Sequence, residues 1–272
     1  MTLISRLRTA LKDPRLAGVD IDSPDLMDVH RQILSEKPLM RHVFTEFYTQ
    51  CVALNRKYFS GTGSEIELGA GVSLFKQVFP QVISTDIKPS PHLDRVLDAQ
   101  AMDLPAASVR AFYAINCFHH LPEPRKFFAE LDRVLVPGGG AILIEPYYGA
   151  FARLLYTHVH TQEGFDLSQR AWESGLGAGQ FMSDANQALS NIVLVRDRAI
   201  FEREFPTLEI VHQATLSNYL RYLLSGGVNF RQLIPGLLEG AVKGLEWVLR
   251  PVEASLALHY VIVIRRRATM AG

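Results

Sequence analysis

The sequence predicts an α/β fold, because a strand pattern meets a helix pattern through a glycine turn. Residues Ser64–Leu68 alternate apolar and polar side chains, as a half-buried strand does. The glycines Gly69 and Gly71 follow directly, and residues 74–79 then place apolar side chains at helical spacing. A strand, a glycine turn and a helix in this order open the nucleotide-binding units of open α/β sheets. We therefore expect a nucleotide-type ligand at this turn.

The spacing of the glycines distinguishes between ligands. Glycines let the backbone approach a ligand closely, and the start of a helix presents free N–H groups. A dinucleotide fingerprint needs a further glycine at position 74, which is Leu74 in this chain. An NAD(P) oxidoreductase is therefore disfavoured. The residue that stands out instead is Glu67, an acid just before the glycines.

Two more acids follow at the expected ends of strands. Residues 81–86 read as a second strand that ends in Asp86, 19 residues after Glu67. An acid at this place can hold both hydroxyls of a ribose. A third segment, residues 96–105, contains Asp98. A lone acid of this kind is more often a solvated loop carboxylate, but three in order favour a nucleotide site.

A fourth strand is expected over residues 111–116 and a fifth over residues 141–146. The loop 117–122 leaves the fourth strand at its carboxyl end, where open α/β sheets bind ligands. A helix should begin at Pro124 and end at the Pro-Gly-Gly-Gly run, residues 137–140. The loop is thus expected to face the ligand.

Four motifs together resemble a known family. They are Glu-Leu-Gly-Ala-Gly (67–71), Asn-Cys-Phe-His-His-Leu-Pro (116–122), Arg-Val-Leu-Val-Pro-Gly-Gly (133–139) and Ile-Glu-Pro (144–146). Residues 64–146 resemble class I S-adenosylmethionine (SAM)-dependent methyltransferases, and within them the methyltransferase type 11 group related to quinone-biosynthesis C-methyltransferases. The frequent third glycine of that family is Ser73 here, a small departure.

The resemblance implies a doubly wound, mostly parallel seven-stranded sheet with SAM across the ends of strands one to four. It implies methyl transfer, with S-adenosylhomocysteine as the product. Asp86 would bind the ribose, and Asp98 would accept from the adenine amino group. The residues expected to contact the cofactor are Glu67, Gly69, Ala70, Gly71, Asp86, Ile87, Asp98, Ala99, Asn116 and Cys117.

His119 is the candidate catalytic residue. His119 and His120 follow the fourth strand, and imidazole can accept a proton at neutral pH. One histidine of such a pair commonly packs under the loop instead, and the related C-methyltransferases do not depend on a histidine here.

The flanking segments suggest four parts. These are an N-terminal helical cap (1–60), the SAM-binding core (61–214), a helical insertion (215–255) and a final strand of the core (256–272). In the insertion an apolar helical stripe, Leu237, Leu238, Ala241, Val242, Leu245 and Val248, is opposed by Glu239, Lys243, Glu246 and Arg250. The insertion could cover the acceptor, or bind a partner or a lipid surface.

The loop 157–166 holds two histidines and two acids within nine residues, His158, His160, Glu163 and Asp166. Three interpretations stay open for it: a polar substrate loop, structural packing, or metal binding. No third ligand is obvious, so no metal is expected.

The composition agrees with a cytosolic enzyme, and we expect a cytoplasmic location. Lys+Arg and Asp+Glu both total 28, so no charge excess indicates a nucleic-acid partner. The start of the sequence lacks the apolar core of a signal peptide, and no apolar run is long enough to span a membrane. We expect a small-molecule or a lipid- or saccharide-linked acceptor, with peripheral membrane contact left open. The alternative is a SAM-binding sensor or subunit that does not catalyse.

Overall fold

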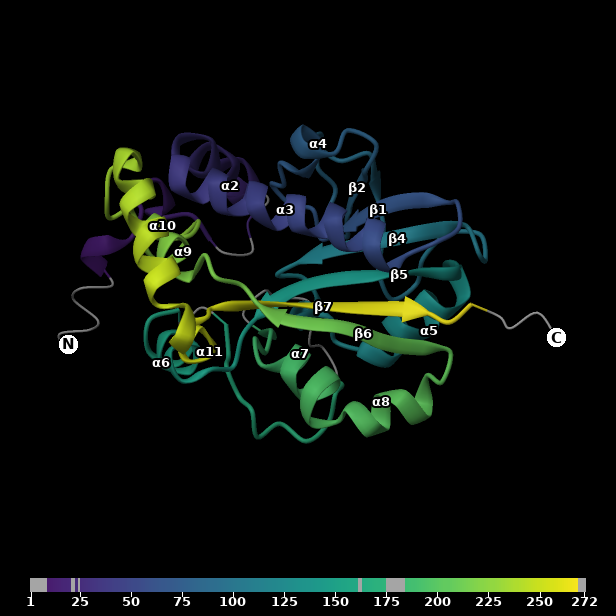
Figure 1. The fold of residues 1–272 in the computed structure, drawn as a ribbon. Coiled ribbons are helices and arrows are strands. Elements are labelled where there is room, and N and C mark those ends of the chain that lie inside the picture. The colour runs from purple at the N-terminus through teal and green to yellow at the C-terminus, as the bar shows by residue number, and fades with distance from the viewer. Residues whose placement is uncertain (1–8, 21–22, 24, 161–162, 175–183, 269–272) are drawn as a thin grey trace.

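The computed structural model describes residues 9–20, 23, 25–160, 163–174 and 184–268. In this part of the chain seven strands form one sheet in the order β3-β2-β1-β4-β5-β7-β6 (Figure 1). The strands are β1 (Ser64–Leu68), β2 (Ile83–Asp86), β3 (Arg95–Val96), β4 (Val109–Ile115), β5 (Leu135–Pro146), β6 (Leu208–Thr215) and β7 (His259–Arg266). Only β7 runs antiparallel to its neighbours, β5 and β6. The predicted doubly wound, mostly parallel sheet is confirmed.

Helices cover the sheet on both faces (Figure 1). One face carries α2 (Asp25–Glu36), α3 (Pro38–Tyr58) and α4 (Phe75–Val78), and the other carries α5 (Pro124–Val134), α7 (Leu189–Asn191) and α8 (Arg198–Glu204). At the carboxyl end of the parallel strands lie α6 (Ala150–His158), α9 (Tyr219–Ser225), α10 (Glu239–Val248) and α11 (Glu253–Leu256). In the described residues no helix is long and apolar enough to cross a membrane.

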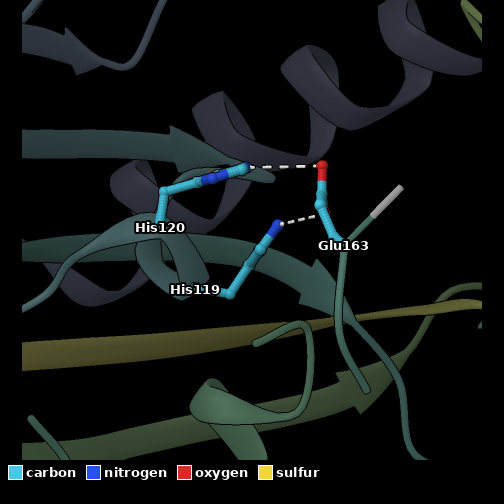
Figure 2. Close-up of side chains that lie close together, drawn as sticks. All are labelled: His119, His120 and Glu163. Atoms are coloured by element: carbon cyan, nitrogen blue, oxygen red, sulfur yellow. Dashed lines mark ion pairs between the residues drawn. The ribbon is translucent and has the colours of Figure 1, made fainter. Parts of the chain in front are cut away.

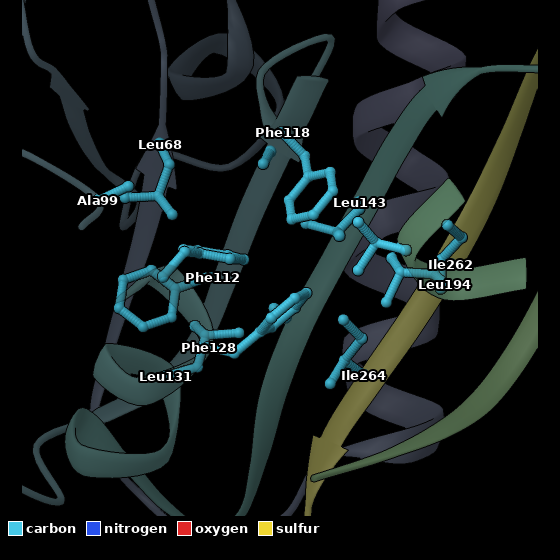
Figure 3. Close-up of a cluster of buried hydrophobic side chains, with 14 of the residues drawn as sticks. Leu68, Ala99, Phe112, Phe118, Phe128, Leu131, Leu143, Leu194, Ile262 and Ile264 are labelled. Atoms are coloured by element: carbon cyan, nitrogen blue, oxygen red, sulfur yellow. The ribbon is translucent and has the colours of Figure 1, made fainter. Parts of the chain in front are cut away.

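The core lies on both faces of the central strands. On β4, Phe112 packs into the cluster with Phe128 and Leu131 of α5, drawn in Figure 3. The next residue, Tyr113, points to the opposite face and meets Phe75 with ring centroids 4.9 Å apart. Successive strand residues point to opposite faces, so a sheet covered on both sides is apolar along its length.

The strand order changes direction at β1, which pairs with β2 on one side and with β4 on the other. Chains leaving β1 and β4 therefore diverge to opposite faces and open a crevice at the carboxyl ends of the strands. The glycine turn after β1 and the loop after β4 both lie at this crevice. The sheet thus brings the predicted ligand-binding segments together.

Two expected elements differ from the structure. The helix expected over residues 74–79 is one turn, α4, so the N–H groups near the crevice belong to the glycine loop. The run 137–140 does not end a helix but lies within β5, which begins at Leu135. A Cβ on Gly140 would lie 2.2 Å from the carbonyl oxygen of Ile264. At that position glycine allows close strand packing.

The helical insertion folds with its apolar stripe outward. Of the stripe, Leu237 is 85%, Leu245 50% and Val248 61% exposed, whereas Glu246 is buried. The physical reason is Arg221 of α9, a buried guanidinium whose Nε donates to Glu246 Oε2 at 2.7 Å. A buried charge needs an opposite charge beside it, so Glu246 and Glu239 of α10 face inward.

Candidate active site

A cavity of about 380 Å³ lies at the carboxyl ends of β1, β2 and β4. We call it the cofactor cleft. All the residues expected at the cofactor line it: Glu67, Gly69, Ala70, Gly71, Asp86, Ile87, Asp98, Ala99, Asn116 and Cys117. They come from four separate segments, which the crossover at β1 brings to one edge of the sheet.

The two glycines of the loop have different tasks. Both adopt positive φ, 61° at Gly69 and 50° at Gly71, a region that favours glycine. A Cβ on Gly69 would lie 2.5 Å from Cys117 Sγ, so this glycine lets the loop pack on the end of β4. A Cβ on Gly71 would meet nothing closer than Asp86 Oδ2 at 3.9 Å. Gly71 therefore keeps space free beside Asp86.

Asp86 is fixed by backbone donors at the end of β2. Its Oδ2 accepts from the N–H of Gly71 at 3.0 Å, and its Oδ1 accepts from the N–H of Lys88 at 3.0 Å. A carboxylate held at both oxygens presents its remaining lone pairs in a set direction. This is the arrangement that recognition of a diol requires.

Two buried oxygens of the cleft have no hydrogen-bond partner among the described residues, Glu67 Oε2 and Asn116 Oδ1. Buried polar atoms are normally paired, since leaving one unpaired is costly. Asn116 also adopts a positive φ of 51°, uncommon for a residue with a side chain. The two oxygens are thus available to a ligand that carries hydrogen-bond donors. SAM, with an ammonium group and ribose hydroxyls, fits that requirement.

Burial raises the pKa of Glu67 to about 8; a hydrogen bond with Ser73 opposes this shift, and the charge of Asp86 adds to it. A carboxyl group in this state sheds its proton readily when a cation arrives beside it. The end of β1 is therefore suited to a positively charged group.

The N-terminal helices complete the cleft. Tyr48 of α3 accepts from the N–H of Leu74 at 3.2 Å, and its ring stacks on Phe75 at 4.7 Å. From α2 the side chains Leu26, Met27, His30 and Leu34 line the cleft. The sequence carries no signal that singles out these α2 residues, because their position depends on how α2 packs.

A second cavity of about 260 Å³ adjoins the first. We call it the distal cavity. Its walls come from the N-terminal segment, α6 and the end of α9, including Leu16, Leu155, Val159 and Leu223. Both cavities are lined by Leu26, His30, Asn116, His120 and Val228. The two cavities therefore meet at the loop that leaves β4.

A histidine–glutamate cluster lies at this junction (Figure 2). His119 and His120 sit on a short 3-10 helix, η2 (Phe118–His120), and Glu163 follows α6. His119 Nε2 lies 3.3 Å from Glu163 Oε2, and His120 Nε2 lies 3.9 Å from Glu163 Oε1 (Figure 2). All three residues line the distal cavity.

Glu145, at the end of β5, contacts His119 on the ring nitrogen that faces away from Glu163. Its Oε2 lies 2.7 Å from His119 Nδ1, and its Oε1 accepts from the N–H groups of Cys117 at 3.0 Å and Phe118 at 2.8 Å. The sequence offered Glu145 only as part of the Ile-Glu-Pro motif. Its role depends on the loop returning over β5, which no local pattern encodes.

The two histidines differ in charge. Burial alone would lower the pKa of His119, but the carboxylates of Glu145 and Glu163 outweigh it and raise the pKa to about 10. Burial and the neighbouring His119 lower the pKa of His120 to about 3. At neutral pH His119 is therefore protonated and His120 is the neutral ring. Proton acceptance by His119 stays a prediction, and it requires His119 to lose this proton first.

The loop 157–166 reaches the distal cavity only in part. His160 and Glu163 line the cavity, whereas His158 is exposed and Asp166 accepts from the N–H of Ser168 at 2.8 Å. Residues Thr161 and Gln162 lie outside the described part of the chain.

The sheet order, the single antiparallel strand β7 and the N-terminal helices define a class I methyltransferase fold. Residues 66–143 match the family model Methyltransf_11, described as a methyltransferase domain. These residues form a SAM-dependent methyltransferase domain, and SAM is the cofactor of that class. The resemblance predicted from the motifs is confirmed.

Several solved structures are similar to this chain. Geranyl diphosphate C-methyltransferase from Streptomyces coelicolor A3(2) is 14% identical, with a TM-score of 0.48, covering 95% of this chain and 89% of its own. A putative sarcosine dimethylglycine methyltransferase from Galdieria sulphuraria is 12% identical, with a TM-score of 0.41, covering 82% and 84%. Phosphoethanolamine N-methyltransferase 2 from Haemonchus contortus is 13% identical, with a TM-score of 0.43, covering 88% and 60%. No curated protein sequence matches the chain.

Proposed function

We propose that this protein transfers a methyl group from SAM in the cofactor cleft to an acceptor in the distal cavity. The observation that carries the proposal is the junction of the two cavities, which share Asn116 and His120. SAM, when bound, supplies an electrophilic methyl group. The chain's part is to align two reactants, which can supply on the order of 7–11 kcal/mol of the barrier.

In this proposal different residues of the cleft bind different parts of the cofactor. Asp86, fixed by two backbone N–H groups, takes the ribose hydroxyls. Glu67 and Asn116, with their unpaired buried oxygens, take the ammonium end. Asp98 and the backbone of Ala99 face the adenine.

The acceptor in this proposal has an apolar body and a polar end. Leucine and valine side chains form much of the wall of the distal cavity, and the histidine–glutamate cluster forms one end. A small molecule with a polar head fits this shape. A lipid-linked acceptor is the second candidate, because Trp247 of α10 and Leu237, just before α10, are exposed to solvent.

The test is incubation of the protein with methyl-labelled SAM and a cell extract, followed by partition of the label between aqueous and organic phases. We expect label in a product other than SAM, and its phase separates a water-soluble acceptor from a lipid-linked one. His119→Ala should keep SAM affinity and reduce labelling by roughly 10²–10⁴. A protein that binds SAM yet gives no labelled product in either phase would support the non-catalytic sensor instead.

A further inference from the structure

We propose that His119, His120 and Glu163 bind a divalent transition-metal ion of the zinc type at the end of the distal cavity. These are side chains from two segments far apart in sequence that converge on one point (Figure 2). Metal binding was one interpretation of the loop 157–166, which lacked an obvious third ligand. In the structure this loop contributes Glu163, and η2 contributes His119 and His120.

The distances between the donor atoms suit such an ion. One ligand atom from each of the three residues can be chosen so that all lie within 4.8 Å of one another. Tetrahedral zinc has bonds of about 2.1 Å, which places its donor atoms roughly 3.4 Å apart. His119 Nε2 lies 3.3 Å from Glu163 Oε2 and His120 Nε2 lies 3.9 Å from Glu163 Oε1, on either side of that value. Small side-chain adjustments therefore suffice to close the site.

The contact of His120 is not an ordinary hydrogen bond. A nitrogen–oxygen distance of 3.9 Å exceeds hydrogen-bonding range. Nε2 of His120 nevertheless points at Glu163 (Figure 2). The 3.9 Å gap leaves room for an ion that binds Nε2 of His120 and the Glu163 carboxylate together.

Glu145 provides the support that metal-binding histidines require. A ligating imidazole usually donates its other N–H to a carboxylate, which fixes the ring and raises its basicity. Glu145 Oε2 lies 2.7 Å from His119 Nδ1, and Glu145 itself accepts from two backbone N–H groups. His119 Nε2 is then the atom directed at the site.

Three protein ligands leave a fourth position, which opens to the distal cavity. Such an open position is typical of zinc sites that act on a ligand. Resting on the proposed function, we infer that the ion binds an oxygen of the acceptor. A hydroxyl bound there has a lowered pKa, passes its proton to solvent, and meets the methyl group as an oxygen anion. The acceptor class is thus an alcohol or a phenol.

The test uses tag-free protein, stripped with EDTA and then dialysed against Zn²⁺ or titrated with Co²⁺. We expect about one equivalent of zinc per chain by elemental analysis, and the visible absorption of tetrahedral Co²⁺. Glu163→Gln and His120→Ala should each reduce the affinity at least tenfold. His42→Ala is the matched control, because His42 is an exposed histidine that also pairs with a glutamate, Glu239.

SAM binding is measured on the same samples, which separates this proposal from the preceding one. Variants that bind SAM as the parent does are folded, so their loss of metal is a loss of the site. Zinc below a tenth of an equivalent, or equal binding by the parent, Glu163→Gln and His120→Ala, would overturn the metal site and leave methyl transfer standing. Metal binding without SAM binding would support the metal site and overturn the proposed methyl transfer. Methyl transfer that EDTA stops and Zn²⁺ restores supports both.

Discussion

At the scale of single residues, Asp86 is oriented before any ligand arrives, because two backbone N–H groups hold its carboxylate. Asp86→Ala should remove charge-assisted hydrogen bonds of roughly 1.5–3 kcal/mol, weakening SAM about ten- to a hundredfold. Calorimetric titration with SAM measures this change.

The control for Asp86 is Asp94→Ala. Asp94 also lies beside β2, but its carboxylate binds Lys76 and the N–H of Ser84, away from the lining of the cleft. We expect Asp94→Ala to lower stability and leave SAM affinity unchanged. Equal SAM affinity in the parent and Asp86→Ala would remove the ribose assignment.

Glu67 couples stability to pH. Its native pKa is about 8 against an ordinary value of 4.5, so between these values the native state holds a proton that the unfolded state has lost. The free energy of unfolding should therefore fall as pH rises through this window. The titratable groups that interact with Glu67 are Tyr48, Cys51, Asp86 and Cys117.

Glu67→Gln should remove this contribution to the slope, a change on the order of a few kcal/mol across the window. Urea unfolding of the parent and the variant near pH 5 and near pH 8 measures the difference. An unchanged slope in Glu67→Gln would mean that Glu67 is ionised in the native protein.

The sequence could predict the cleft residues that sit at strand ends or in the glycine turn, but not those that α2 contributes. It could not assign Glu145 and Glu163. Both glutamates pair with His119, which lies on another loop; Glu145 is 26 residues away from it in the sequence. Such pairs form only when the sheet edge and the helices beyond it are assembled.

At the scale of elements, the helix expected from Pro124 was predictable, and as α5 it packs its apolar face on the sheet. The outward stripe of α10 was not. Its orientation is set by Arg221, which lies on another helix and pairs with Glu246 and Glu46. Periodicity identifies an amphipathic helix but does not say which of its faces is buried.

Arg221→Met should destabilise the protein by roughly 3–5 kcal/mol, because Glu246 would be left buried without a positive partner. The double variant Arg221→Met with Glu246→Leu should recover much of this loss. Urea unfolding of both variants measures the effect. A single variant within about 0.5 kcal/mol of the parent would show that other contacts orient α10.

At the scale of the whole molecule, the site is built where three layers meet. The sheet supplies the strand ends, α2 and α3 close one side of the cleft, and α6 and α9 wall the distal cavity. The fold class was predictable from one third of the chain, because that part carries the strand-end motifs. The distal cavity was not, since it is formed by segments without a family pattern.

The central claim is that SAM binds at the glycine loop, and the most direct measurement is calorimetric titration of Gly71→Val with SAM. Both Gly71 and Gly18 have positive φ with no described atom closer than 3.9 Å to an added Cβ, but only Gly71 lines the cleft. Gly18→Val therefore reproduces the backbone strain without filling the site. We predict that Gly18→Val binds SAM as the parent does and that Gly71→Val, still folded by circular dichroism, does not. SAM binding by Gly71→Val at the parent affinity would contradict the account.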